Sequence, residues 1–144
     1  LDAYERLHGD YSAFPGIDRA LQLLQERGVS MAIVTGKGRQ SAAISLKYLG
    51  LASYFEMIEA GSASGAVKPQ AMQKVLAHWG VSPQHVACIG DSPSDVRSAK
   101  HVGALSLGAA WASTASAARL SAEEPSVLFH TVENFITWIE RNVD

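Results

Sequence analysis

The chain alternates helix-like and strand-like segments, and this alternation constrains its fold more than any other feature. Four times, a helical stretch with apolar residues at a 3.6-residue period leads through a glycine into a short apolar run; these glycines are Gly28, Gly50, Gly80 and Gly103. Glycine at this place is typical of a helix C-terminus, where the backbone turns left-handed. Short apolar strands joined by amphipathic helices require βαβ crossovers. We therefore predict an α/β fold with a mostly parallel sheet between two layers of helices.

The predicted elements follow from these runs. We expect strands at residues 31–35, 57–60, 86–90 and 105–108, and a further one at 127–130. A last helix at about 132–141 places Phe135, Trp138 and Ile139 on one face. The Ala/Ser-rich stretch WASTASAARLSAEEPS is expected to hold a short surface helix. The stretch LHGDYSAFPG is typical of a boundary, here between a short N-terminal helix and the repeating core.

Composition narrows the class of protein. With 144 residues, 47% of them hydrophobic, the chain has the length of one globular domain. A formal net charge of −2 argues against a nucleic-acid-binding surface, which needs a basic excess. No apolar run approaches the ~20 residues that span a bilayer. The single cysteine, Cys88, excludes an internal disulfide and fits a reducing, cytoplasmic setting; its place inside an apolar strand predicts a packing role.

The segment VACIGDSPSDVRSAK, residues 86–100, contains the first candidate site. An apolar strand stops at Asp91, and a helix start follows in which Ser92 suits the N-cap and Pro93 the first helical position. Asp95 falls at the third helical position, where its carboxylate can accept backbone N–H groups, so it can be a capping residue alone. The alternative is that Asp91 and Asp95 serve a hard cation such as Mg²⁺, because ligands bind at the carboxyl ends of strands in α/β sheets.

Two other segments carry groups that suit a phosphate. The first strand ends at Thr35 and continues into GKGRQS, where Gly36 lets the backbone approach an anion closely. This loop is not a dinucleotide loop, since Ser41 replaces the third glycine, and it lacks the glycine spacing of a Walker motif. Lys68 stands before Pro69 at a predicted helix entrance; a solvated surface lysine is the alternative interpretation.

A threonine at one strand end, a Lys-Pro before a helix and a Gly-Asp-x-x-x-Asp at a later strand end occur here in that order. This order resembles the haloacid dehalogenase superfamily, from Phe14 to the end of the chain. Within this superfamily, the sequence is most similar to the phosphoglycolate-phosphatase-like branch, which has a small helical cap. The segments that carry this similarity are FPGIDRALQLLQERGVSMAIVTGKG, KPQ and IGDSPSDVRSAKHVGA. The resemblance implies a Rossmann-like core, a Mg²⁺ cofactor and a small phosphorylated substrate.

The resemblance also implies roles for single residues. The catalytic candidates are Thr35, Lys68, Asp91 and Asp95. Phosphate would be held by Thr35, Gly36 and Lys68, with the adjacent Lys37 as a further candidate contact. Asp91 would bind Mg²⁺ directly, Asp95 would act from its outer shell, and Ser92 is an additional candidate ligand.

One family motif is missing. The first motif, Asp-x-Asp-Gly-Thr, supplies the nucleophile from the central strand, and no Asp-x-Asp occurs in these 144 residues. The chain therefore resembles a C-terminal portion, with residues 1–13 as the end of a cap and linker and residues 14–144 as the hydrolase core. Without the central strand, the strands ending at Thr35 and Gly90 should not pair. We expect a slot one strand wide, about 10 Å, between Ile33 and Ile89, or another segment filling it.

The expected function is that of a Mg²⁺-dependent phosphatase working through an aspartyl-phosphate, with the nucleophile upstream of this chain. The fragment alone should then be inactive. A phosphomutase or phosphonate hydrolase on the same fold is one alternative, and a non-catalytic phosphate-binding protein is another. A true dehalogenase needs no metal, which would leave Asp91 and Asp95 unexplained. The substrate and the oligomeric state do not follow from the sequence.

Overall fold

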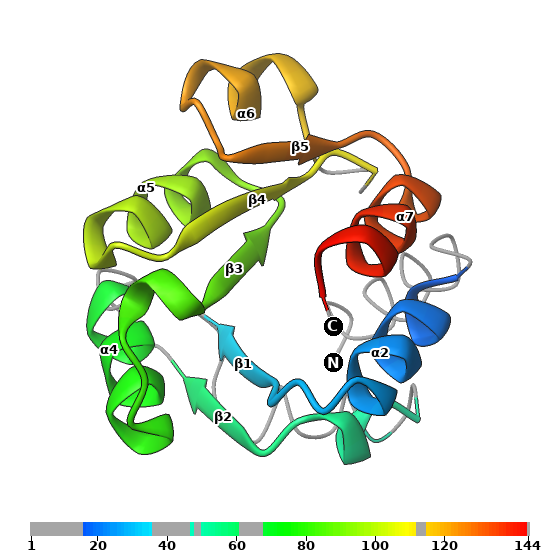
Figure 1. Cartoon of the computed structure of the whole chain (residues 1–144). Coiled ribbons are helices and arrows are strands. Elements are labelled where there is room, and N and C mark those ends of the chain that lie inside the picture. Colours follow the sequence, from blue (N-terminus) through cyan, green and yellow to red (C-terminus); the bar gives the residue numbers. More distant parts are fainter. Residues whose placement is uncertain (1–15, 36–46, 48–49, 61–67, 112–114, 144) are drawn as a thin grey trace.

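The computed structural model describes residues 16–35, 47, 50–60, 68–111 and 115–143 (Figure 1). Helices and strands alternate through them as predicted, and each predicted strand is present within one residue of its expected ends. The predicted N-terminal helix and residues 1–13 lie outside the described residues. In chain order the elements are α2 (Ile17–Glu26), β1 (Ala32–Thr35), η1 (Ala52–Tyr54), β2 (Met57–Ala60), α4 (Lys68–Trp79), η2 (Pro83–His85), β3 (Ala87–Gly90), α5 (Pro93–Val102), β4 (Leu105–Ala109), α6 (Ala117–Ala122), β5 (Val127–Phe129) and α7 (Val132–Asn142).

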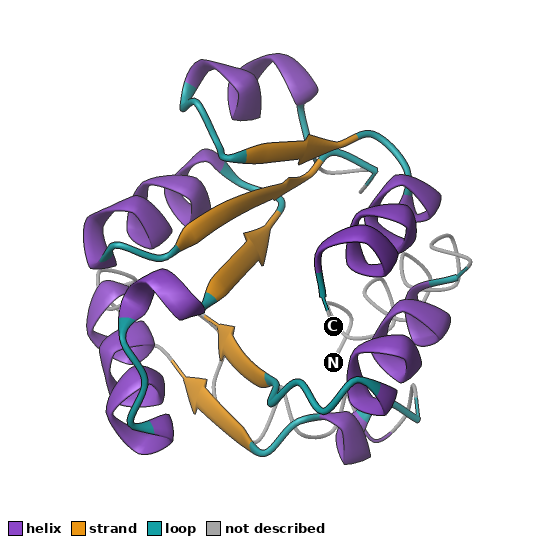
Figure 2. Ribbon diagram, viewed as in Figure 1, coloured by secondary structure: helices purple, strands orange, loops and turns teal. Residues whose placement is uncertain are grey.

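All strand pairs that the structure describes are parallel, as the alternating pattern predicts (Figure 2). β1 pairs with β2, with Ile33 opposite Ile58. β3, β4 and β5 form a second sheet, in which Ile89 lies opposite Leu107. The Ala/Ser-rich stretch contains α6, whose Leu120 is fully buried. The α/β fold with parallel strands is therefore confirmed.

The two sheets are separate at the place where the missing strand was expected. β1 and β3 belong to different sheets, and no strand among the described residues pairs with their other sides. Ile89, in the middle of β3, is 43% exposed, whereas its register partner Leu107 on β4 is 3% exposed. The prediction that these two strands do not pair is confirmed. The width of the slot and what fills it stay predictions.

Helices hold the two sheets in one body. α4 packs against β1 and β2, α5 packs against β3 and β4, and the two helices pack against each other. α2 and α7 pack together on the opposite side of the strands (Figure 1). Successive strand residues face opposite layers, so Cys88 meets Met72 of α4 while Leu107 joins the core against α7. The sheets are thus joined by helix–helix packing rather than by a continuous ladder.

The core lies between the second sheet and the helices α2 and α7. Its buried residues are Ala20, Leu107, Phe129, Phe135 and Ile139. The rings of Phe129 and Phe135 are 5.2 Å apart between centroids, within the separation at which aromatic rings attract each other. This cluster confirms the apolar face predicted for the last helix.

Arg27, directly after α2, ties that helix to the end of α7. Its guanidinium donates hydrogen bonds to the carbonyls of Ile139, at 3.0 Å, and Glu140, at 3.2 Å, and also to that of Val143. The carbonyl of Ile139 also accepts the N–H of Val143, and all three carbonyls lie at the end of α7, where helical N–H donors run out. A cation here also complements the helix dipole.

Left-handed glycines follow helical segments where the sequence predicts them. Gly28, Gly50, Gly80 and Gly103 have φ values of 73°, 72°, 65° and 85°. At Gly103 the turn brings the next residue back, so that the N–H of Ala104 donates to the carbonyl of Ala99 in α5. No helix within the described ranges is long and apolar enough to cross a membrane.

Candidate active site at the end of β3

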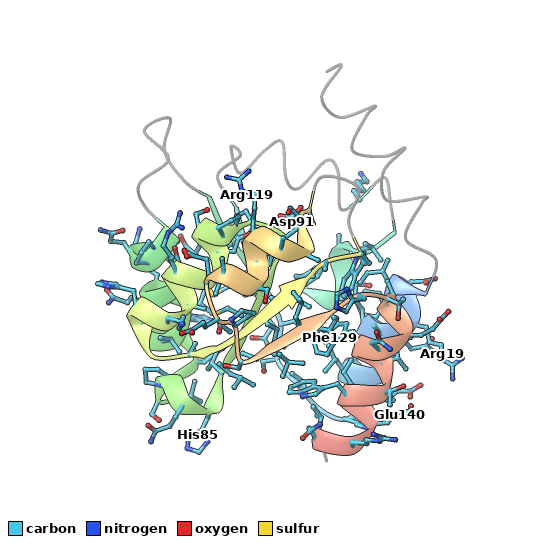
Figure 3. All side chains as sticks on the ribbon, turned by 90° about the horizontal axis from the view of Figure 1, so that it is seen from above. Arg19, His85, Asp91, Arg119, Phe129 and Glu140 are labelled. Carbon is cyan, nitrogen blue, oxygen red and sulfur yellow. The ribbon has the colours of Figure 1, made fainter. Side chains whose placement is uncertain are left out.

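Asp91 lies directly after β3, at the carboxyl edge of its sheet. Its side chain is exposed. Figure 3 shows it at the side of the molecule opposite His85, which precedes β3. The carboxyl ends of parallel strands are where α/β proteins bind ligands. The position therefore suits a carboxylate that meets a ligand from solvent.

The turn after Asp91 is a complete capping box. The Oγ of Ser92 accepts the N–H of Asp95 at 3.3 Å, and the Oδ2 of Asp95 accepts the N–H of Ser92 at 3.2 Å. Pro93 occupies the first helical position, where its missing N–H costs no hydrogen bond. The capping role predicted for Ser92 and Asp95 is confirmed.

The two carboxylates of the segment therefore differ in their surroundings. Asp95 is half-buried and one of its oxygens binds the Ser92 amide, which also places negative charge at the positive end of α5. Asp91 is exposed on the preceding turn. Oxygen ligands of this kind suit a hard cation such as Mg²⁺, which is usually held by one or two carboxylates together with substrate oxygens.

Cys88 is next to this site but is not a nucleophile. Burial and, to a smaller extent, the negative charge of Asp95 together raise the pKa of its thiol from 9.0 to about 11. Its Sγ lies 3.9 Å from the Sδ of Met72 on α4. A thiol with so high a pKa stays protonated at neutral pH. This environment agrees with the packing role predicted from its place in the strand.

Of the other predicted site residues, the structure describes the backbone of two. Thr35 is the last residue of β1, paired with Ala60 of β2, and Lys68 is the first residue of α4. Their backbones thus occupy the strand end and the helix entrance that the sequence predicts. Gly36 and Lys37 lie outside the described residues, so the proposed phosphate contacts stay predictions.

One residue of the site was missed by sequence reasoning. Gly90, the last residue of β3, lies so close to Asp95 that a β carbon built on it would be 2.4 Å from both the Cβ and the Oδ2 of Asp95. The signal in the sequence was the glycine of Gly-Asp-x-x-x-Asp, but the pattern does not say which side chain fills the space above it.

Comparison with known proteins identifies the family. The model of the haloacid dehalogenase-like hydrolase family matches residues 1–109. A probable phosphoglycolate phosphatase of Pseudomonas putida is 34% identical over 110 residues, which cover 75% of this chain and 44% of that protein. The phosphoglycolate phosphatase of Pseudomonas putida KT2440 is 31% identical over 130 residues, covering 89% of this chain and 47% of that protein.

The same likeness is found in three dimensions. A haloacid dehalogenase-like hydrolase from Streptococcus pneumoniae superposes with a TM-score of 0.80 at 23% identity, covering 88% of this chain and 59% of that one. At this identity the superposition shows a shared fold. The chain spans about half the length of the two phosphatases, 44% and 47%. By the match of its sequence to the family model, the chain belongs to the haloacid dehalogenase-like hydrolases.

Proposed function

We propose that this chain provides the metal- and phosphate-binding part of a phosphatase that acts on a small phosphorylated metabolite, with 2-phosphoglycolate as the first candidate. The observation that carries the proposal is the exposed Asp91 at the carboxyl end of β3, followed by the capping box of Ser92 and Asp95. Two relatives that bear the name phosphoglycolate phosphatase support the choice of substrate class.

The cofactor in this proposal is Mg²⁺. The exposed carboxylate of Asp91 is a ligand of the type that this ion prefers, and Asp95 holds the turn that carries it. Within the ranges that the structure describes, no three His, Cys, Asp or Glu side chains form a metal-binding group. Asp91 would therefore share the ion with oxygens of the substrate and with ligands from other parts of the protein. When bound, the ion would supply positive charge beside the phosphoryl group.

The phosphoryl group would be held from two further places. Thr35 at the end of β1 and the following Gly36 would contribute a hydroxyl and a backbone N–H, and Lys68 at the start of α4 would contribute a cation. Lys37 is an additional candidate contact in the same loop. Donors fixed in place before the reaction stabilise the charge that develops on the phosphoryl oxygens.

The nucleophile of the proposed reaction lies outside these 144 residues, since they contain no Asp-x-Asp. An aspartate carboxylate would attack phosphorus, the ester oxygen would leave, and water would then hydrolyse the aspartyl-phosphate to inorganic phosphate. A strand between β1 and β3 would bring such an aspartate between Thr35 and Asp91. The separation of the two sheets supports this placement.

The test measures release of inorganic phosphate by the full-length gene product from 2-phosphoglycolate and from a panel of sugar phosphates, with Mg²⁺ and with EDTA. Phosphate release that needs Mg²⁺ is the expected result. Isomerisation of a sugar phosphate without phosphate release would instead identify a phosphomutase. Binding of inorganic phosphate without turnover of any substrate would identify a binding protein. Either of these two results would overturn the proposal.

A further inference from the structure

We propose that Gly90 is a positioning residue of this site: its missing side chain lets Asp95 lie against the end of β3 and hold Asp91 in place. The consequence for catalysis rests on the proposed function, whereas the contact itself does not. Gly90 has no ligand contact in this proposal and acts through Asp95.

The requirement for glycine at this position is steric. A β carbon on Gly90 would lie 2.4 Å from the Cβ and the Oδ2 of Asp95 and 2.5 Å from its Cγ. Carbon atoms in van der Waals contact are about 3.5–4.0 Å apart, so no side chain fits without a shift. Gly90 is not among the glycines with positive φ, so its backbone conformation does not itself require glycine.

The clash cannot be relieved by rotating Asp95. Its Cβ is attached directly to the backbone of α5, and its carboxylate accepts the N–H of Ser92 within the capping box. A methyl group on Gly90 would therefore have to push the start of α5 away from the end of β3, or break the Asp95–Ser92 hydrogen bond. Either change moves the turn between them.

Asp91 is the single residue in that turn between Gly90 and Ser92. Asp95 contacts both neighbours of Asp91. It lies against Gly90, the residue before Asp91, and it accepts the N–H of Ser92, the residue after Asp91. One side chain thus restrains the backbone on both sides of Asp91. A displacement of the order of 1 Å at a reacting group can cost about 10²-fold in rate.

Gly108 provides a matched control. It lies opposite Gly90 in the ladder between β3 and β4, at the same carboxyl edge. A β carbon there would come within 2.8 Å of the Cδ1 of Leu128 and 3.7 Å of the Cγ of Pro125. The closer atom is the end of a flexible side chain, which can rotate away. Gly108→Ala therefore adds the same methyl group without touching the capping box.

The first experiment compares Gly90→Ala with Gly108→Ala in the full-length, metal-free protein by hydrogen exchange of the Ser92 amide. Gly90→Ala should speed this exchange about tenfold, as expected for loss of a hydrogen bond, and Gly108→Ala should leave it unchanged. In the phosphatase assay, Gly90→Ala should lower kcat about 10²-fold and change KM little. Equal Ser92 exchange and an equal urea midpoint in the wild type and in Gly90→Ala would overturn the proposal.

A second pair of variants covers the case in which Gly90→Ala does not fold. Asp95→Gly removes the β carbon that the added methyl group would meet, so Gly90→Ala combined with Asp95→Gly should have the same urea midpoint as Asp95→Gly alone. If the double variant is destabilised as much as Gly90→Ala, the contact is not the reason for the glycine. These readouts need no substrate, so a wild-type protein without phosphatase activity would refute the proposed function and leave this inference to be judged on exchange and stability.

Discussion

Because one side of β3 is exposed, truncation of two neighbouring apolar residues should have different costs in the free energy of unfolding. Ile89 and Leu107 are register partners on β3 and β4, and both would be interior residues of a continuous sheet. In this chain Ile89 is 43% exposed and Leu107 is 3% exposed. We compare their truncations, Ile89→Ala and Leu107→Ala, because the two positions differ mainly in what covers them.

The expected costs follow from burial. Full burial of an aliphatic side chain contributes about 1.5–3 kcal/mol, and a truncation inside a packed core costs about 2–5 kcal/mol because a cavity is left behind. Leu107→Ala should fall in that second range. The side chain of Ile89 is only a little more than half buried, and its truncation leaves no closed cavity. Ile89→Ala should therefore lower the free energy of unfolding by about 1 kcal/mol.

Urea unfolding of the 144-residue chain, followed by circular dichroism, measures both values, and an unchanged m value shows that the two states are comparable. In a protein with a strand between β1 and β3, Ile89 would be covered and the cost of Ile89→Ala should rise toward that of Leu107→Ala. If Ile89→Ala already costs as much as Leu107→Ala in the 144-residue chain, β3 has no open side and the separation of the two sheets is wrong.

The remaining predictions concern three side chains, Arg27, Cys88 and Lys68. Arg27→Met keeps the apolar stem but removes the hydrogen bonds to the end of α7, and should lower the free energy of unfolding by about 2 kcal/mol in thermal unfolding, with the exposed Arg19→Met as its control. Cys88 should react with iodoacetamide at pH 8 about 100-fold more slowly than an unperturbed cysteine, because its pKa is raised from 9.0 to about 11, and Asp95→Asn should speed the reaction. Since the raised pKa belongs to the folded state, stability should fall as the pH rises from about 9 to about 11, and Cys88→Ala should remove this loss. Lys68→Ala should reduce kcat/KM for a phosphate ester about 10²-fold, the cost of one lost electrostatic contact; an unchanged value would show a solvated surface lysine.

Local sequence patterns predicted the elements well because each one is determined by nearby residues. The strand at 57–60 follows from an apolar run, and the end of α5 from the left-handed Gly103, at φ 85°. The capping box of Ser92 and Asp95 could also be predicted, since both partners lie within one helical turn.

The contacts between distant elements could not be predicted in this way. The hydrogen bonds from Arg27 to the end of α7 join residues more than a hundred positions apart, and no sequence pattern around Arg27 predicts them. The exposure of Ile89 is also invisible locally, because its apolar neighbours are typical of a covered strand. The separation of the sheets was expected from the family resemblance and the missing Asp-x-Asp, not from the strands themselves.

The candidate site could be predicted from the sequence in part. The order of Thr35, Lys68 and Asp91 along the chain predicted which strand and helix ends carry polar groups, and the structure places their backbones there. The need for glycine at position 90 depends on the distance between a strand end and a helix side chain, which only the folded structure provides.

The central claim, that Asp91 supplies the carboxylate of a phosphatase site, is tested most directly by Asp91→Asn in the full-length protein. Asparagine keeps the size and the exposed position of the side chain but removes the charge that a hard cation needs. Glu133→Gln, an exposed acid in the first turn of α7, is the matched control. We predict that Asp91→Asn lowers the Mg²⁺-dependent release of phosphate by about 10³-fold or more in a protein that is still folded by circular dichroism, while Glu133→Gln stays at the wild-type rate. An Asp91→Asn protein that releases phosphate at the wild-type rate would contradict the claim.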